Sequence, residues 1–295
     1  MFKLQGVVPP MITPFDMEGN LDVPKLELLV DFLSERVNGL FICGSYGSGP
    51  LMNVEERKKV ADICVKVSKG RVKVIAHTGT TNTRDTVELT RHAQEVGCDG
   101  AAAVGPYYYH HRKDSLMAFY GAMLESVSAD FPVYLYHNPT FSGYETPLDV
   151  LKRLIDLGLH GIKDATFNIR TFATYRRELA PDGFDVVLGT EAMWTAARSL
   201  GAEAFIPGLG NAFPEICGQM WREGMENNFE TCRQTQFKVN ELREVMYLAR
   251  STQLAVYAML EIRNVMKAYP RSPFVPATEE EKANIHKALD EMGVL

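Results

Sequence analysis

Lys163 is the residue of this sequence best suited to nucleophilic chemistry. It ends the short apolar run HGIK and is followed by DAT. A lysine at the end of a buried strand loses hydration, which lowers the pKa of its ammonium group and leaves a fraction as the neutral amine that attacks carbonyl carbons. The position therefore indicates a Schiff-base nucleophile. The structural alternative is a lysine paired with the neighbouring Asp164.

Tyr136 ends the preceding apolar run, in PVYLYHNPTFSG. Alternate side chains of a strand share a face, so Tyr134 and Tyr136 are expected together, opposite Val133, Leu135 and His137. A phenol beside the lysine's strand can relay protons during carbinolamine formation and C–C cleavage. Packing is the alternative role of this tyrosine.

The glycine-rich segment GSYGSGP runs from Gly44 to Pro50. Glycines let backbone N–H groups and the Ser45 hydroxyl approach an anion, such as a substrate carboxylate. The segment lacks the spacing and the lysine of a nucleotide-binding loop. A tight turn without a ligand is the alternative interpretation.

The segment GPYYYHHRK contains three tyrosines and two histidines, Tyr107 to His111. This composition is compatible with an aromatic oligomer contact, a metal site or a nucleic-acid platform. Adjacent histidines without a nearby acidic partner or an HExxH motif disfavour a metal. His77, in VIAHTGTTNT, is interpreted as a core or pocket histidine rather than a catalytic base.

Eight short apolar runs must position these side chains. Each is followed by Gly, Asn, Thr or Pro, as expected of parallel strands buried on both faces, and helical patterns lie between them at intervals of roughly 25 to 34 residues. This alternation predicts an α/β fold, a (β/α)₈ TIM barrel with a C-terminal three-helix extension. The runs are GVVPPMI, GLFICG, VKVIAH, GAAAV, PVYLYH, HGIK, DVVLG and AEAFI.

The predicted organisation is a catalytic barrel over residues 1–226 and a helical extension over 227–295. Barrel enzymes build their sites from loops at the carboxyl ends of strands, and the loops after strands seven and eight often bind phosphate. Here these loops are GTEAMW, which starts at Gly189, and IPGLGNAF, which starts at Ile206. Gly189 is therefore a candidate substrate-binding residue, and a phosphorylated substrate is one of the open alternatives.

The composition excludes several classes of protein. The 295 residues carry a formal charge of −6 without a long block of one sign, which argues against nucleic-acid and membrane partners. Five scattered cysteines without a CxxC pair argue against disulfides and thiolate metal sites. No signal peptide or membrane-spanning apolar run is recognised, so a cytoplasmic location is expected.

Four motifs follow expected strands in this order: GSYGSGP, GPYYYHH, YLYHNPTFSG and HGIKDAT. Over essentially the whole chain the sequence resembles the dihydrodipicolinate synthase / N-acetylneuraminate lyase family of class I aldolases. The most specific part is a tyrosine in a Y-x-x-P-x-x-S/T-G context, followed 27 residues later by the lysine of G-I/V-K. The resemblance implies that Lys163 forms a Schiff base with pyruvate and that Tyr136 relays protons.

Four further residues match family positions. Ser45 and Tyr46 match a pair of hydroxyl residues that hold the substrate carboxylate and pass protons. Synthases have threonine at the second position, so Tyr46 either fills pocket volume or replaces the relay. Tyr108 matches a catalytic tyrosine that reaches across a dimer interface into the neighbouring active site, and Ile206 matches a residue whose carbonyl faces the oxo acid. The resemblance thus implies a homo-oligomer, commonly a homotetramer built as a dimer of dimers.

Two departures bear on the substrate. Phe141 stands where synthases carry an arginine that binds the second substrate's carboxylate, a contact that an apolar ring cannot supply. Ser48 stands where synthases and sialic-acid lyases have glutamate. The resulting G-x-x-G-x-G-P form resembles 2-keto-3-deoxy-sugar-acid aldolases, as do SGYETPLDVLKRL and AYPRSPFVPATEEE. The expected pocket walls are Tyr46, Phe141, Thr166, Glu191 and Asn211.

The expected function is that of a lyase that cleaves or forms a C–C bond between pyruvate and an aldehyde, without metal or cofactor because the imine stabilises the carbanion. Alternatives with the same imine are a dihydrodipicolinate synthase-like condensation and a dehydratase, deaminase or hydratase-aldolase. A non-catalytic 2-oxo-acid-binding regulator is an alternative of another class. A phosphosugar barrel enzyme without a Schiff base would bind phosphate at Gly189 and Gly208.

Overall fold

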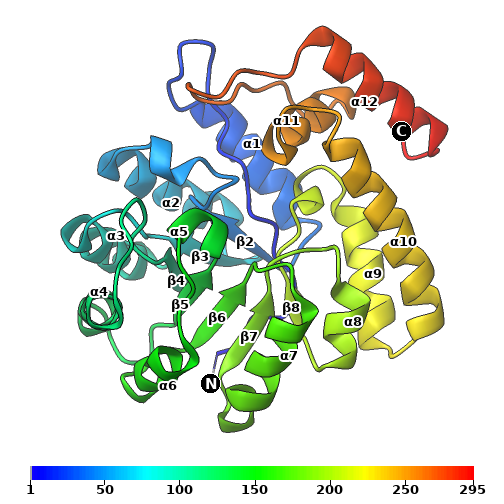
Figure 1. Cartoon of the computed structure of the whole chain (residues 1–295). Helices are drawn as coiled ribbons and strands as arrows, with labels where there is room; N and C mark the ends of the chain where they lie inside the picture. Colours follow the sequence, from blue (N-terminus) through cyan, green and yellow to red (C-terminus); the bar gives the residue numbers. More distant parts are fainter. Residues whose placement is uncertain (1) are drawn as a thin grey trace.

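The computed structural model describes residues 2–295, the side chain of residue 182 excepted. Eight parallel strands form one sheet in the order β1-β8-β7-β6-β5-β4-β3-β2, surrounded by helices (Figure 1). The predicted (β/α)₈ barrel is confirmed. The strands are β1 (Gly6–Val7), β2 (Gly39–Ile42), β3 (Lys73–His77), β4 (Gly100–Val104), β5 (Val133–His137), β6 (Gly161–Asp164), β7 (Asp185–Leu188) and β8 (Ala204–Phe205).

The first strand is shorter than the run GVVPPMI predicts. It pairs with β8 over two residues only, because Pro9 and Pro10 have no N–H to continue the ladder. The chain still closes the barrel against β2. The Phe41 N–H donates to the Pro9 carbonyl and the Met11 N–H donates to the Phe41 carbonyl, both at 3.0 Å.

The helices of the barrel follow the strands as their apolar periodicity predicts. In α2, the Asn53 side chain accepts the backbone N–H of Glu56, whose carboxylate accepts that of Asn53 in return, so the helix begins directly after the glycine-rich loop. The helices are α1 (Val23–Ser34), α2 (Val54–Ser68), α3 (Thr83–Val96), α4 (Lys113–Glu125), α5 (Pro139–Ser142), α6 (Leu148–Asp156), α7 (Ile169–Glu178), α8 (Trp194–Ser199) and α9 (Pro214–Met225).

Two apolar layers result from strand alternation. Tyr134 and Tyr136 of β5 share one face and Val133 and Leu135 the other, as predicted; the tyrosines point into the barrel and the aliphatic pair faces the helices. Tyr134 lies towards the amino ends of the strands, where its hydroxyl donates to Asp185 Oδ2 at 2.8 Å. Tyr136 lies towards the carboxyl ends, where barrel enzymes place their chemistry.

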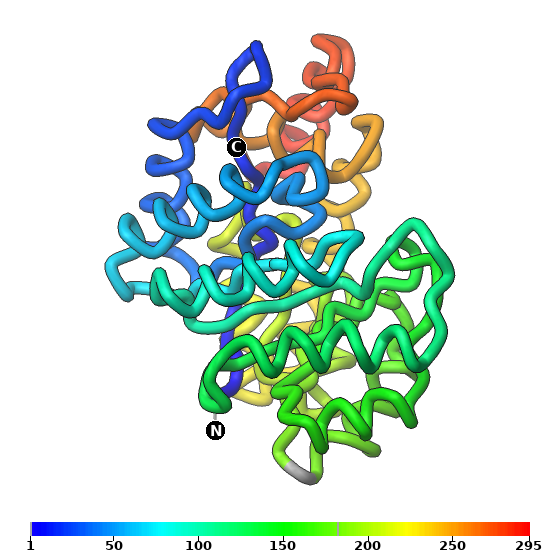
Figure 2. The backbone as a smooth tube through the Cα atoms, turned by 90° about the vertical axis from the view of Figure 1, so that its left-hand side faces the viewer, coloured from blue at the N-terminus to red at the C-terminus, as the bar shows by residue number. Residues whose placement is uncertain are grey.

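Three helices follow the barrel, as predicted: α10 (Phe229–Met246), α11 (Thr252–Ile262) and α12 (Glu279–Glu291). Helix α10 packs on α8 and α9, and α11 contacts the short 3₁₀ helix η3 (Leu209–Asn211). Figure 2 shows the segment after α11 beside the N-terminal loop. Arg271, in this segment, donates to both carboxylate oxygens of Glu56 on α2, at 2.6 and 2.7 Å. The division into two domains at residue 226 stays a prediction.

No helix among residues 2–295 combines the length and the apolar character that crossing a membrane requires.

Candidate active site

Lys163 lies inside the barrel on β6 and is 4% exposed. Its Nζ is 3.8 Å from the centroid of the Tyr136 ring and 3.9 Å from that of Phe41. Burial lowers the pKa of Lys163 to about 7, because the charged form loses its hydration, and burial is the sole cause. Among the described residues, therefore, no counter-ion holds the ammonium form. Asp164 points instead to its own loop, where its Oδ1 accepts the backbone N–H of Thr166 at 3.1 Å.

Tyr136 and Lys163 are register partners on β5 and β6, so their side chains project from adjacent strands into one space. The Tyr136 hydroxyl lies 3.5 Å from Ser45 Oγ. Burial raises the pKa of Tyr136 against the opposing hydrogen bonds of Ser45 and Asn138. The phenol thus keeps its proton at neutral pH and can pass it on. The structure brings together the lysine, the phenol and the hydroxyl that the sequence singled out.

Two neighbours of this group were missed in the sequence. Asn138 Nδ2 donates to the Tyr136 hydroxyl at 3.1 Å and so orients it. Phe41 covers the lysine from β2. Asn138 follows Tyr136 by two residues, and this period-two spacing is the signal that could have identified it. No comparable signal marks Phe41 among the apolar residues of its strand.

Tyr46 is held by the C-terminal extension. Its hydroxyl donates to Thr252 Oγ1 at 2.8 Å and rests against Gly208, where a Cβ would lie 2.6 Å from the phenol oxygen. Gln253 Nε2 donates to the Tyr46 carbonyl at 2.9 Å and to Ser48 Oγ at 2.8 Å. The phenol of Tyr46 thus hydrogen-bonds to α11 and fills the space above Gly208.

Glu191 and Asn211, expected as pocket walls, use their polar atoms within the protein. Glu191 is 1% exposed and accepts the N–H groups of Gly208 at 3.2 Å and Leu209 at 3.3 Å. Arg243 Nη1, from α10, lies 3.0 Å from the same carboxylate. Asn211 is fully buried, and its side chain bonds only to backbone groups. Both residues therefore support the expected pocket wall through hydrogen bonds inside the protein.

The remaining predicted residues occupy different places. Ile206 lines the barrel interior in one apolar cluster with Tyr136. Gly189 follows β7, where a Cβ would lie 2.5 Å from the Asp164 carbonyl oxygen, so close strand packing requires glycine there. Phe141, on α5, is 54% exposed. Tyr108 is 84% exposed and does not enter the site of its own chain.

His77 is confirmed as a buried structural histidine. Its Nε2 accepts the backbone N–H of Val104 at 3.0 Å. Burial, followed by the nearby charge of Arg57, lowers the pKa of His77 well below its usual value, so the ring stays neutral. Arg57 Nη2 donates to the His77 carbonyl at 2.5 Å and thereby secures the start of the next loop.

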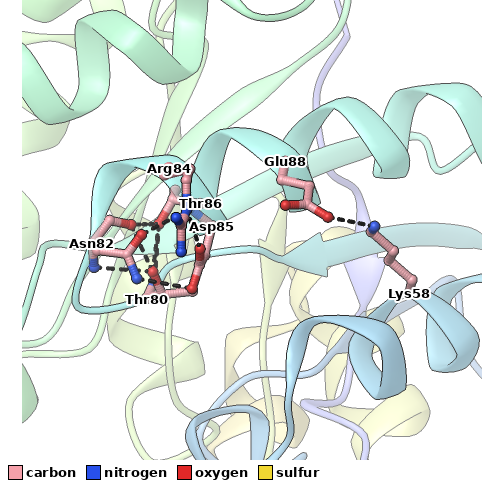
Figure 3. Close-up of polar contacts among 7 residues, drawn as sticks. All are labelled: Lys58, Thr80, Asn82, Arg84, Asp85, Thr86 and Glu88. Atoms are coloured by element: carbon pink, nitrogen blue, oxygen red, sulfur yellow. Dashed lines mark hydrogen bonds and ion pairs between the residues drawn. The ribbon is translucent and has the colours of Figure 1, made fainter.

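The polar loop after β3 caps a helix rather than presenting catalytic groups (Figure 3). Thr80 Oγ1 donates to the Asn82 carbonyl at 2.7 Å, and Asn82 Oδ1 accepts the backbone N–H of Asp85 at 2.9 Å. Lys58 Nζ, 2.6 Å from Glu88 Oε1, joins α2 to α3. Among residues 2–295, no cluster of three or more His, Cys, Asp or Glu side chains is arranged to hold a metal ion.

A (β/α)₈ barrel that buries an unpaired strand-end lysine beside a protonated phenol defines a class of protein, the barrel lyases that work through a lysine imine. The model of the dihydrodipicolinate synthetase family matches residues 3–292, and the chain belongs to this family of Schiff-base pyruvate aldolases. The resemblance seen in the sequence is confirmed, and the chain is an enzyme of the lyase type.

Named relatives match almost the whole chain. The 4-hydroxy-tetrahydrodipicolinate synthase of Methanosarcina mazei is 28% identical over 293 residues, 99% of each chain. The solved structure of YagE, an E. coli K12 prophage protein of the dihydrodipicolinic acid synthase family in complex with pyruvate, has a TM-score of 0.93 at 26% identity and covers 99% of both chains. The solved structure of dihydrodipicolinate synthase from Aquifex aeolicus has a TM-score of 0.92 at 27% identity, and 99% of both chains is again covered.

Proposed function

We propose that this enzyme is a class I aldolase that cleaves or forms the C–C bond between pyruvate and an aldehyde in a 2-keto-3-deoxy sugar acid. The observation that carries the proposal is the environment of Lys163. Its amine has a pKa lowered to about 7 by burial, and it lies between two aromatic rings with no counter-ion in the part of the chain that the structure describes. Such an amine is a ready nucleophile for a ketone.

In the proposed cleavage, the Lys163 lone pair attacks the C2 ketone to give a carbinolamine. Tyr136 supplies the proton with which the C2 hydroxyl leaves as water, and an iminium ion remains. The C3–C4 bond then breaks, its electron pair passes into the iminium to form an enamine, and the C4 hydroxyl returns a proton to Tyr136 as the aldehyde forms. Protonation of the enamine at C3 and hydrolysis release pyruvate and the free lysine.

The loop after β2 is suited to the substrate carboxylate. The Ser45 hydroxyl is half-buried beside Tyr136, and the backbone of the loop is folded tightly, since a Cβ on Gly49 would overlap the Cys43 carbonyl. Because glycine has no Cβ, the backbone of such a loop can approach an anion closely. We propose that Ser45, with the Ile206 carbonyl opposite, orients the oxo acid for attack.

The side chain at position 141 supports a sugar-acid substrate over a synthase-like condensation. A synthase would need a cation there for its second carboxylate, and Phe141 offers an exposed apolar ring instead. A neutral aldehyde needs no such bidentate partner. Relatives named as synthases, at 26–29% identity, differ from this chain at most positions, so membership of the family does not by itself fix the second substrate.

Incubation of the enzyme with 2-keto-3-deoxygluconate is expected to release pyruvate and glyceraldehyde in equal amounts. The reason is that the enamine left after C3–C4 cleavage has pyruvate as its only hydrolysis product. Chromatography with mass detection of both products checks the ratio. Loss of water from the substrate without pyruvate release would contradict the aldolase and assign a dehydratase acting through the same imine.

We also propose that the enzyme works as a homo-oligomer in which Tyr108 serves the partner's site. This tyrosine has a backbone φ of +83°, a conformation that is costly for a non-glycine residue and that clusters at functional sites. It lies edge-on to the exposed Tyr109, with ring centroids 5.0 Å apart, so two aromatic side chains face outward together. Exposed aromatic pairs of this kind favour protein contacts.

The double variant Tyr108→Ala, Tyr109→Ala is expected to weaken this association, because it removes the apolar area buried between copies. Sedimentation velocity should show a dimer or tetramer for the wild type and smaller species for the variant, with a parallel loss of turnover. Lys152→Ala, a change on the exposed face of α6, serves as control. A wild-type monomer with full turnover would contradict the proposal.

A further inference from the structure

We infer that the aldehyde half of the substrate is a neutral polyhydroxylated chain, and that the wall after β7 and β8 excludes a phosphate group because Glu191 occupies the backbone amides that would bind it. The inference deepens the proposed function and rests on it. It concerns a property that the sequence left open, since loops in this position of a barrel often bind phosphate.

The amides at the start of η3 are already bound to an internal anion. The Gly208 N–H donates to Glu191 Oε2 at 3.2 Å and the Leu209 N–H donates to Oε1 at 3.3 Å. Consecutive N–H groups at the start of a helical turn are the usual cradle of a phosphate. The Glu191 carboxylate takes that place from inside the protein. A phosphate brought to the same wall would find both N–H groups occupied, and burying its charge without donors to bind it is unfavourable.

The cation nearest to these amides, Arg243, also has its partners within the protein. Arg243 Nη1 lies 3.0 Å from Glu191 Oε1, and Nη2 donates to the Tyr247 hydroxyl at 3.1 Å. The ring of Phe167 covers the guanidinium, with its centroid 5.4 Å from the central carbon. The Arg243 side chain is 11% exposed, so little of it remains free for a ligand. Together the pair contributes no net charge to this wall.

The groups left for a substrate are neutral hydrogen-bonding groups. Tyr46 contributes a phenol oxygen that donates to Thr252 and can still accept a hydrogen bond, and it stays un-ionised because burial and the Glu191 charge raise its pKa. Asn138 Oδ1 is buried without a hydrogen-bond partner among the described residues. Buried polar atoms are normally satisfied, and a hydroxyl group of a bound sugar chain would satisfy this one. Neutral donors and acceptors of this kind match a polyol and offer nothing to balance a dianion.

The test compares D-glyceraldehyde with D-glyceraldehyde 3-phosphate as acceptors for pyruvate. The wild type is expected to show a kcat/KM at least about tenfold higher for the unphosphorylated aldehyde, within the range that one unfavourable pocket contact gives. Glu191→Gln keeps the shape and removes the charge, so it should lower this ratio by raising kcat/KM for the phosphorylated aldehyde. Glu244→Gln removes the same charge from an exposed position on α10 and should leave the ratio unchanged.

The wild-type ratio decides the question even if Glu191→Gln fails to fold. Equal or better use of the phosphorylated aldehyde would overturn the inference, and so would failure of the wild type to use either aldehyde while it forms the pyruvate imine. In both cases the Lys163 chemistry would stand. Failure to form any imine would instead overturn the proposed function, and the inference with it.

Discussion

Lys163→Ala is expected to abolish covalent capture of pyruvate. Wild-type protein incubated with pyruvate and reduced with borohydride should gain one reduced pyruvyl group on the peptide that contains Lys163, and the variant should gain none. Turnover should fall by about 10⁴-fold or more, the scale seen when a catalytic nucleophile is removed. The reason is that no other described lysine lies buried in the barrel interior. Intact and peptide masses before and after reduction provide the measurement.

The pH dependence of this capture is a second readout of the same site. The pKa of Lys163 is lowered to about 7 by burial, so below pH 7 most molecules carry an ammonium ion that cannot attack a carbonyl. The initial rate of imine formation should therefore rise as the pH increases through 7 and then level off. Lys152→Ala, which removes an exposed lysine paired with Glu178, is the matched control and should keep full capture. An adduct that persists in Lys163→Ala would refute the assignment.

Tyr136→Phe is expected to lower kcat by about 10³-fold, within the range of general acid–base catalysis. The substitution keeps the ring that packs against the Lys163 amine, 3.8 Å away, and removes only the hydroxyl. Carbinolamine dehydration and C–C cleavage both lose their proton carrier, so the imine should still form, but slowly. Stopped-flow trapping and steady-state turnover on one protein preparation measure the two effects.

Tyr134→Phe is the control for that experiment because the two tyrosines lie on one strand and point into the same barrel. The Tyr134 hydroxyl donates to Asp185 at the opposite end of the strands, far from the lysine. Its removal should cost about 1–3 kcal/mol in the free energy of unfolding and leave kcat intact. Equal losses of kcat in the two variants would show that Tyr136 acts through packing, and an unchanged kcat in Tyr136→Phe would show that another group relays the proton.

The fold and the centre of the site could be predicted because their signals are local. Parallel strands buried on both faces give short continuous apolar runs, and all eight were recognisable. Consecutive strands of a barrel are neighbours, so Tyr136 and Lys163, each near the end of its strand, had to approach each other. The period of two along β5 then fixed which of its side chains entered the barrel. These properties depend only on residues that lie within about 30 positions of one another in the sequence.

Only the tertiary structure determined which groups hold Tyr46, in the loop after β2, and Glu191, in the loop after β7. Arg243, Thr252 and Gln253 reach the site from helices about 50 to 210 residues away from the groups that they bind. The sequence marked Glu191 as a pocket residue, and the structure shows that its carboxylate binds backbone amides and Arg243 instead. Side-chain type and spacing determine which chemistry a residue can perform. Which partner satisfies a buried polar group depends on the packing of distant elements, because every such group must find a partner once water is excluded.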